Sequence, residues 1–339
     1  MTKWLPSEID TLKKHYGVIP VRDIMSKLPG RTWDSVGGKA KRLGLVSSIY
    51  RRKSSHSISP SDLPQTDDLS ELWDAITTLQ SASLKQSTRL DHVDTTINIS
   101  EPIAVGFLAD VHIGALTCKY TDFLNRFDAI VNTPNFYLFS VGDTIDNYLP
   151  GRHPSGMFAQ LVPPELQKQL IEDVYSKMRG RWLGMVQGCH AEFSHDADDF
   201  DWTKYLSHKV GAPNLGFGGS VTLTVGHQPY EIMLRHKYRF NSSLNVTSSV
   251  KRMREQLGDF DVGCISHFHQ AAVEQAIMGD GVDRVFIRPG SFKGSDRWSR
   301  SMGYSDAGAY IPTVVLYPDR RLMIPFLHLE QAILFMESL

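Results

Sequence analysis

The 339-residue sequence is poor in cysteine and has no long uninterrupted apolar segment. Its three cysteines, Cys118, Cys189 and Cys264, are odd in number and far apart, which argues against paired disulfides and for a reducing compartment. No run of about 18 apolar residues is present, and the first ten residues lack the apolar core of a signal peptide. We therefore expect a cytoplasmic protein with no membrane partner.

A strong net charge is also missing, but the balance hides two parts of opposite sign. The formal net charge of the chain is −1. Residues 1–53 hold 12 Lys and Arg against 4 Asp and Glu, a net charge of +8, so the other 286 residues carry −9. Such a basic head is typical of a module that binds nucleic acid.

Apolar periodicity in the head predicts three short helices, over residues 5–16, 20–28 and 32–45. Ser7 is the expected N-cap of the first helix, and Thr32 or Asp34 that of the third. Three such helices with a small apolar seam predict a helix-turn-helix domain over residues 1–53. The candidate nucleic-acid contacts are Arg31, Lys39, Lys41, Arg42, Arg51, Arg52 and Lys53.

Trp4, the stretch LPGRT before the third helix and KAKRLGL at its end resemble the Myb/SANT-like helix-turn-helix modules over roughly residues 3–46. The resemblance implies DNA as a partner, with basic side chains of the third helix on phosphates and polar ones at base edges. A protein-docking bundle with solvated charges is the alternative. Gly37 and Gly38 count against a stable third helix, because each costs about 1 kcal/mol relative to alanine.

The composition of residues 54–98 predicts a linker followed by a helix. Residues 54–66 are rich in Ser and Pro, as flexible connections are. An apolar helical stripe follows, formed by Leu69, Leu72, Ile76 and Leu79. This stripe fits either a homo-oligomer formed through residues 67–93 or a helix that packs on the body.

From residue 99 to residue 339, apolar strands alternate with helices, which predicts a mixed α/β domain. The expected helices cover residues 120–131 and 163–180. The expected strands cover residues 103–110, 136–143, 181–188, 220–226, 230–236, 261–267, 284–291, 312–318 and 321–329.

Five of these strands end in side chains of the kinds that bind metals. They are Asp110 and His112, Asp143, Cys189 and His190, His236, and His267 and His269. Residues spaced i,i+2 lie on one side of an extended segment, so each D-x-H or H-x-H pair can act together. A site for two divalent cations about 3.5–4 Å apart needs one bridging carboxylate, several neutral imidazoles and strands that converge at one edge.

The order D-x-H, GD-x-x-D, G-x-H, H and H-x-H resembles the calcineurin-like metallophosphoesterases over roughly residues 102–330. The resemblance implies a two-sheet sandwich flanked by helices, here preceded by the small all-α three-helix domain, and a hydrolase that acts on phosphate esters. The stretches LRHKYRFNSSLN and RPGSFKGSDRW look most like phage-encoded members, which places the protein in a bacterial or phage-infected host cell.

The same resemblance implies two divalent ions, with manganese expected and zinc, iron, nickel or magnesium as alternatives. The first ion would be held by Asp110, His112 and His269. The second would be held by Cys189, His236 and His267, and Asp143 would bridge the two. His190 would face the substrate and stabilise the transition state or protonate the leaving oxygen. The residues expected behind the ligands or along the substrate cleft are Asp146, Asn147, Arg152, His153 and Glu192.

Cys189 departs from the family pattern Gly-Asn-His, in which the asparagine oxygen binds the second metal. A thiolate favours zinc or iron over manganese, whereas a neutral thiol is a poor ligand for a hard cation. Ala191 stands where an acidic residue often follows, which leaves Glu192 as a substitute. A natural variant, an altered metal preference, a weakened enzyme and an engineered substitution all remain open.

Three functions follow from these features. The first is a metal-dependent phosphodiesterase that cuts DNA, a nuclease brought to its substrate by the helix-turn-helix head. The second keeps the chemistry but makes the protein a phosphomonoesterase or a small-nucleotide phosphodiesterase. In the third, Cys189 disables the site and leaves a DNA-binding or scaffold protein.

Overall fold

The computed structural model describes residues 4–45, 69–86, 91–150, 154–242, 244–303, 306 and 308–339, and the chain divides into two compact units, Met1–Thr78 and Leu79–Leu339. Several predictions lie outside the described residues: the linker at 54–66, and the side chains of Arg51, Arg52, Lys53, Arg152 and His153. No helix among the described residues is both long and apolar enough to cross a membrane.

Three helices form at the N-terminus, as the apolar periodicity predicts: α1 (Pro6–His15), α2 (Val21–Lys27) and α3 (Trp33–Arg42). Their shared core consists of Leu12, Ile24, Leu28, Val36 and Ala40. Thr32 caps α3 as expected, because its side chain accepts a hydrogen bond from the Ser35 backbone N–H at 3.3 Å.

The Ser7 cap is wrong. Leu5 is the N-cap of α1 and Pro6 is the first helical residue, a position where the missing N–H of proline costs nothing. Glu8 takes over the capping role, since its carboxylate accepts the Leu5 backbone N–H at 2.7 Å.

Arg31 links α1 to the turn before α3. Its Nε and Nη2 donate to the two carboxylate oxygens of Glu8 at 2.9 and 2.6 Å, and its guanidinium lies 4.4 Å from the centre of the Trp4 ring. The side chain is only 9% exposed. These contacts give Arg31 a role in the fold of the module, and its contact with nucleic acid stays a prediction. Lys41 and Arg42 are exposed on α3.

The predicted helix after the linker is α4 (Leu69–Gln86). Five large apolar side chains of this helix are 43–68% exposed: Leu69, Leu72, Trp73, Ile76 and Leu79. A partner for this stripe stays a prediction.

Two sheets form the second unit. The five-stranded sheet runs in the order β11 (Met323–Phe326), β10 (Thr313–Leu316), β2 (Ile103–Leu108), β3 (Phe136–Val141) and β4 (Trp182–Val186). The six-stranded sheet runs in the order β1 (His92–Ile97), β5 (Gly218–Val225), β6 (Gln228–Arg235), β7 (Val262–Ile265), β9 (Asp283–Arg288) and β8 (Ala272–Ile277).

All nine predicted strands form, and the structure adds β1 and β8, which lie at the two edges of the six-stranded sheet. β1 pairs in parallel with β5. Residues 92–97 therefore belong to a sheet, whereas the sequence assigned them to a linker that ended at residue 98.

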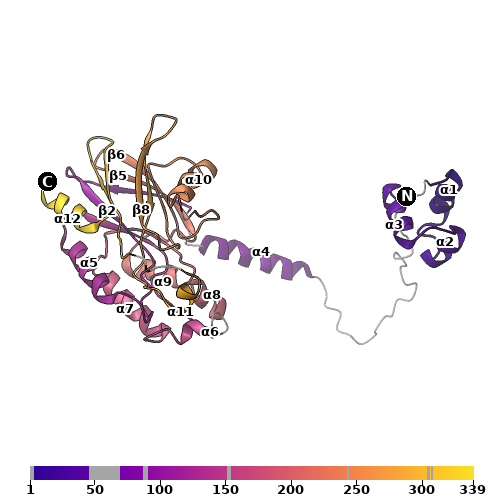
Figure 1. Ribbon diagram of the computed structural model, residues 1–339, viewed down its shortest axis with the longest axis horizontal. Coiled ribbons are helices and arrows are strands. Elements are labelled where there is room, and N and C mark those ends of the chain that lie inside the picture. Colours follow the sequence, from indigo (N-terminus) through magenta and orange to yellow (C-terminus); the bar gives the residue numbers. More distant parts are fainter. Residues whose placement is uncertain are drawn as a thin grey trace. The chain divides into compact units, whose positions relative to one another are not determined.

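The sheets pack face to face, and helices cover their outer faces, as expected for a two-sheet sandwich. Strand β2 shows the layering: Ile103, Val105 and Phe107 face the core between the sheets, while Ala104 and Leu108 face the helices. The helices on the five-stranded sheet are α5 (Tyr120–Asn132), α7 (Pro164–Ser176), α9 (Trp202–Val210) and α12 (Leu329–Glu337). α10 (Ser248–Leu257) covers the other sheet, away from α5 and α7 (Figure 1). Three short helices complete the unit: α6 (Pro154–Met157), α8 (Glu192–Asp198) and α11 (Arg297–Ser301).

Candidate metal centre

The strand ends that carry ligand-type residues come together. Strands β2, β3 and β4 are parallel neighbours in one sheet, and β6 and β7 are parallel neighbours in the other. Their carboxyl ends therefore lie at common edges, and the residues that follow them meet where the two sheets face each other.

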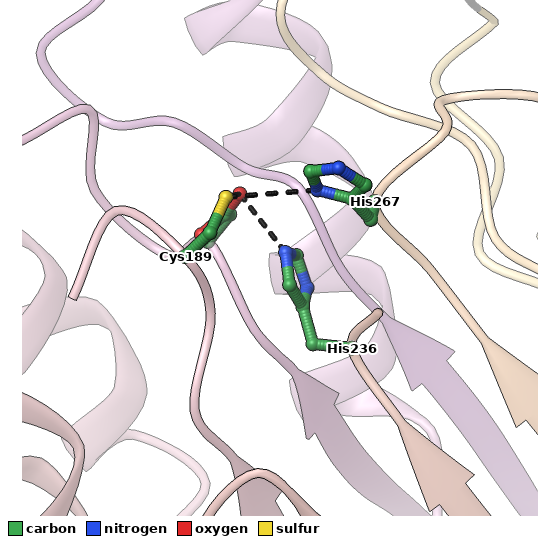
Figure 2. Close-up of side chains that lie close together, drawn as sticks. Cys189, His236 and His267 are labelled. Carbon is green, nitrogen blue, oxygen red and sulfur yellow. Dashed lines mark hydrogen bonds and ion pairs between the residues drawn. The ribbon is translucent and has the colours of Figure 1, made fainter. Parts of the chain in front are cut away.

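The ligand atoms form three overlapping groups, and within each group all atoms lie within 4.8 Å of one another. The groups are Asp143, Cys189, His236 and His267; Asp110, His112 and His269; and His112, Asp143 and His190. Figure 2 shows Cys189, His236 and His267 pointing toward one another. The structure thus brings together every metal ligand that the sequence predicts.

The backbone at these positions is unusual. Five of the ligand residues have left-handed backbone angles, with φ between 47° and 74°: Asp110, His112, Asp143, His267 and His269. An L-residue in this region costs roughly 1–2 kcal/mol and persists where the surrounding structure enforces it. The sharp turns at the strand ends aim the ligand side chains at one point.

Two glycines allow the strand ends to approach. A Cβ on Gly142 would lie 2.4 Å from Nδ1 of His236, and a Cβ on Gly188 would lie 2.0 Å from the backbone nitrogen of Asp143. Gly142 also has a φ of 92°. The glycines of the GD and G-x-H motifs are therefore needed for close approach as well as for turning.

The hydrogen bonds determine which ring nitrogens can bind a metal. Nδ1 of His112 donates to Asp146 Oδ1 at 3.2 Å, and Nδ1 of His236 donates to the Val141 carbonyl at 2.9 Å. Nε2 of both rings consequently points into the cluster, where it binds a metal when it carries no proton.

Buried acceptor atoms at the centre of the cluster lack hydrogen-bond donors. Within the described part of the chain, Nε2 of His112, Nε2 of His236 and Oδ1 of Asp110 are buried without a hydrogen-bond partner. Asp143 Oδ2 lies 3.1 Å from His236 Nε2, so either a proton on this nitrogen or a metal ion must balance the carboxylate charge. Buried ligand atoms that point to one place and lack hydrogen-bond partners call for a cation between them. The carboxylate, imidazole and thiol groups present here suit divalent metal ions.

The electrostatics of the cluster show how strongly the Asp143 carboxylate requires a neighbouring positive charge. Burial alone would raise the pKa of Asp143. The surrounding imidazoles, among which His236 has the largest effect, instead hold that pKa well below its usual value. In return, Asp143 raises the pKa of His236 well above normal, against the effect of burial. Burial lowers the pKa values of His112 and His267 to about 4, so these two rings are neutral and ready to coordinate.

The surroundings of Cys189 favour the neutral thiol over the thiolate. Burial, reinforced by the charge of Asp143, raises the pKa of its thiol to about 12, and Sγ donates to Asp143 Oδ2 at 3.1 Å. The sulfur lies 3.6 Å from Nδ1 of His267.

His190 is held from two sides. Its backbone N–H donates to Asp143 Oδ1 at 2.8 Å, and its ring Nδ1 donates to the backbone carbonyl of Asp146. The ring packs edge-on against His112 at 4.6 Å between centroids and against Tyr148 at 5.1 Å. Nε2 is therefore the ring nitrogen that remains for a substrate.

The other predicted residues take different places. Asp146 lies behind His112, and Asn147 lies behind His190, since its Nδ2 donates to the His190 carbonyl at 2.7 Å. Glu192 begins α8, and no hydrogen bond or ion pair between it and the ligand residues is present in the described part of the chain.

Lys293 is a residue of this site that sequence reasoning missed. Its Nζ donates to Asp146 Oδ1 at 2.8 Å, lies 3.5 Å from Asp296 Oδ2 and stands 5.2 Å from the centre of the Tyr148 ring. The side chain is 10% exposed. Together with His112 it holds the pKa of Asp146 at about 2, although burial acts in the opposite direction. No spacing signal marks a lysine in a loop 147 residues further along the chain.

No protein-family model matches this sequence, and no curated protein gives a significant match. The fold is similar to a predicted phosphoesterase from Streptococcus pneumoniae, with a TM-score of 0.33 and 12% identity over 66% of this chain and 97% of that chain. It is similar to Vps29 complexed with zinc from Entamoeba histolytica, with a TM-score of 0.32 and 13% identity over 66% and 97%. A third similar structure is the calcineurin-like phosphoesterase YfkN from Bacillus subtilis, with a TM-score of 0.32 and 11% identity over 70% and 97%. Two of these three are phosphoesterases by name; the phage-type and Myb-like resemblances stay predictions.

Replacing Lys293 with methionine should leave the buried Asp146 carboxylate without its lysine partner. Because loss of one partner leaves the other charge unpaired, we expect the free energy of unfolding to fall by about 3 kcal/mol in urea denaturation. The double variant Lys293→Met/Asp146→Asn should recover most of this loss. Lys177→Met, which breaks an exposed ion pair with Asp128, is the control and should cost less than about 1 kcal/mol. Equal small losses in both single variants would contradict the assignment.

Proposed function

We propose that this chain is a dimetal-dependent phosphodiesterase that hydrolyses DNA, and that its N-terminal helices bind the DNA. The observation that carries the proposal is the buried cluster, in which five strand ends present carboxylate, imidazole and thiol groups whose acceptor atoms face one another. Burying so many polar ligand atoms would destabilise an ordinary protein core, whereas two divalent cations would bind these atoms.

Each ion would have its own set of side chains, and the Asp143 carboxylate would belong to both sets. Asp110, His112 and His269 would hold the first ion. The second ion would be held by Cys189, His236 and His267, and Asp143 belongs to groups on both sides. When bound, two such ions orient a phosphate ester and lower the pKa of a water between them.

The remaining steps belong to side chains of this protein. Lys293 and Asp146 keep His112 in the tautomer whose Nε2 faces the cluster. Hydrolysis forms a bond from the water oxygen to phosphorus and breaks the bond from phosphorus to the leaving oxygen, which must gain a proton. His190, fixed through Nδ1, presents Nε2 as the donor of that proton.

DNA is the substrate that the charge distribution favours. Residues 1–53 carry +8 in a chain whose net charge is −1, so a polyanion would be drawn to that end. Lys41 and Arg42 are exposed on α3, the helix expected to contact DNA. A phosphomonoesterase or small-nucleotide phosphodiesterase would use the same cluster but would have no need of this module for binding its substrate.

Asp143→Asn should abolish hydrolysis, because it removes the carboxylate that both ions share. We expect cleavage of end-labelled single- and double-stranded DNA with added Mn²⁺ to fall by at least about a hundredfold. Asp128→Asn, at an exposed carboxylate on α5, is the control and should cut normally. Undiminished cutting by Asp143→Asn would refute the proposal. Faster turnover of generic monoesters than of DNA by the unaltered chain would favour the phosphomonoesterase.

The double variant Lys41→Met/Arg42→Met tests the role of α3. We expect weaker DNA binding and a salt dependence reduced by about one unit of slope for each lost phosphate contact. Hydrolysis of a small generic diester should stay unchanged. Lys13→Met/Lys14→Met removes the same charge from an exposed part of α1 and serves as the control. If both double variants weaken DNA binding equally, α3 has no special role.

A further inference from the structure

The two metal-binding groups of the cluster, one around Asp110 and one around Asp143, differ in ligand type, because only the second includes a sulfur atom. The group around Asp110 offers one carboxylate and two imidazoles, all hard or intermediate donors. The group around Asp143 offers a carboxylate, two imidazoles and the thiol of Cys189. Ligand softness is a main source of metal selectivity in proteins, so the two groups should not choose the same ion.

The placement of Cys189 separates it from the other cysteines of the chain. Cys118 and Cys264 are buried in hydrophobic cores, where a cysteine acts as a small apolar side chain. Cys189 belongs to no hydrophobic core cluster among the described residues. Its sulfur faces Asp143 and His267, and Figure 2 shows the Cys189 side chain pointing toward His236 as well.

The spacing of the four donor atoms suits a small tetrahedral ion. Zinc bonds of about 2.0–2.3 Å in tetrahedral geometry separate neighbouring ligand atoms by roughly 3.3–3.8 Å. Here the sulfur lies 3.1 Å from Asp143 Oδ2 and 3.6 Å from His267 Nδ1, and Asp143 Oδ2 lies 3.1 Å from His236 Nε2. These three distances lie within a few tenths of an ångström of that range, and all four ligand atoms lie within 4.8 Å of one another. Two imidazoles, one thiolate and one carboxylate are ligands that zinc uses in proteins.

We propose that Cys189, His236, His267 and Asp143 form a zinc-selective position, and that the Asp110 position takes a harder ion such as manganese. The protein would then hold a mixed-metal centre. This inference rests on the proposed dimetal function and deepens it. When zinc binds, the S–H bond of Cys189 is replaced by an S–Zn bond and the proton passes to water.

The test uses the metal-free full-length chain and cobalt as a spectroscopic stand-in for zinc. Titration with Co²⁺ should produce a near-ultraviolet thiolate-to-cobalt absorption band. Dialysis against one equivalent of Zn²⁺ and a large excess of Mn²⁺, followed by elemental analysis, should find one zinc per chain. Cys189→Asn should lose the band, and its preference for zinc over manganese should fall by at least about tenfold.

Two further variants keep the test decisive. Cys189→Ser exchanges only sulfur for oxygen and should also lose the band, with an unchanged far-ultraviolet circular dichroism spectrum as evidence of folding. Cys264→Ala removes a core cysteine between the sheets and should keep both the band and the zinc preference.

The outcomes separate the inference from the function on which it rests. Cobalt binding without the band, in a chain that holds two ions and cuts DNA, would overturn the zinc-selective position and leave the proposed function standing. Tighter binding of manganese or ferrous iron than of zinc at this position would overturn it as well. A chain that binds no divalent ion would overturn both.

Discussion

Buried carboxylates that need positive charge are the constraint around which this protein is organised. Asp110, Asp143 and Asp146 are almost completely shielded from water. A bare carboxylate in such a place is costly, so each must be matched by donors or cations. Asp146 is matched by Lys293 and by His112 from within the chain. Asp110 and Asp143 accept hydrogen bonds from backbone N–H groups and face the imidazoles of His269 and His236, and divalent metal ions would supply the remaining positive charge.

The fold serves that arrangement. Two sheets, each with parallel strands, bring their carboxyl ends to one place, and the core between them holds that geometry. The left-handed turns at the strand ends and the close contacts at Gly142 and Gly188 are unfavourable in isolation. They persist because the packing of both sheets enforces them, which is the usual origin of strain at functional sites.

Much of this could be read from the sequence, because strand ends and ligand residues are local features. Apolar runs predicted the nine strands, and the five runs that stop at Asp, His or Cys predicted the ligand set that the structure brings together. The edge strands β1 and β8 were missed, because they expose much of their surface and lack an apolar run. The partners of Arg31 and Lys293 could not be found either. Glu8 is 23 residues from Arg31, Asp146 is 147 residues from Lys293, and composition carries no information on such pairs.

The most direct test of the account is a crystal structure of the chain grown with divalent metal, with ions located by anomalous scattering. The account predicts two ions about 3.5–4 Å apart. One should contact Asp110, His112 and His269, the other should contact Cys189, His236 and His267, and Asp143 should touch both. Ions found only elsewhere on the protein, or a fully occupied cluster that excludes Asp143, would contradict it.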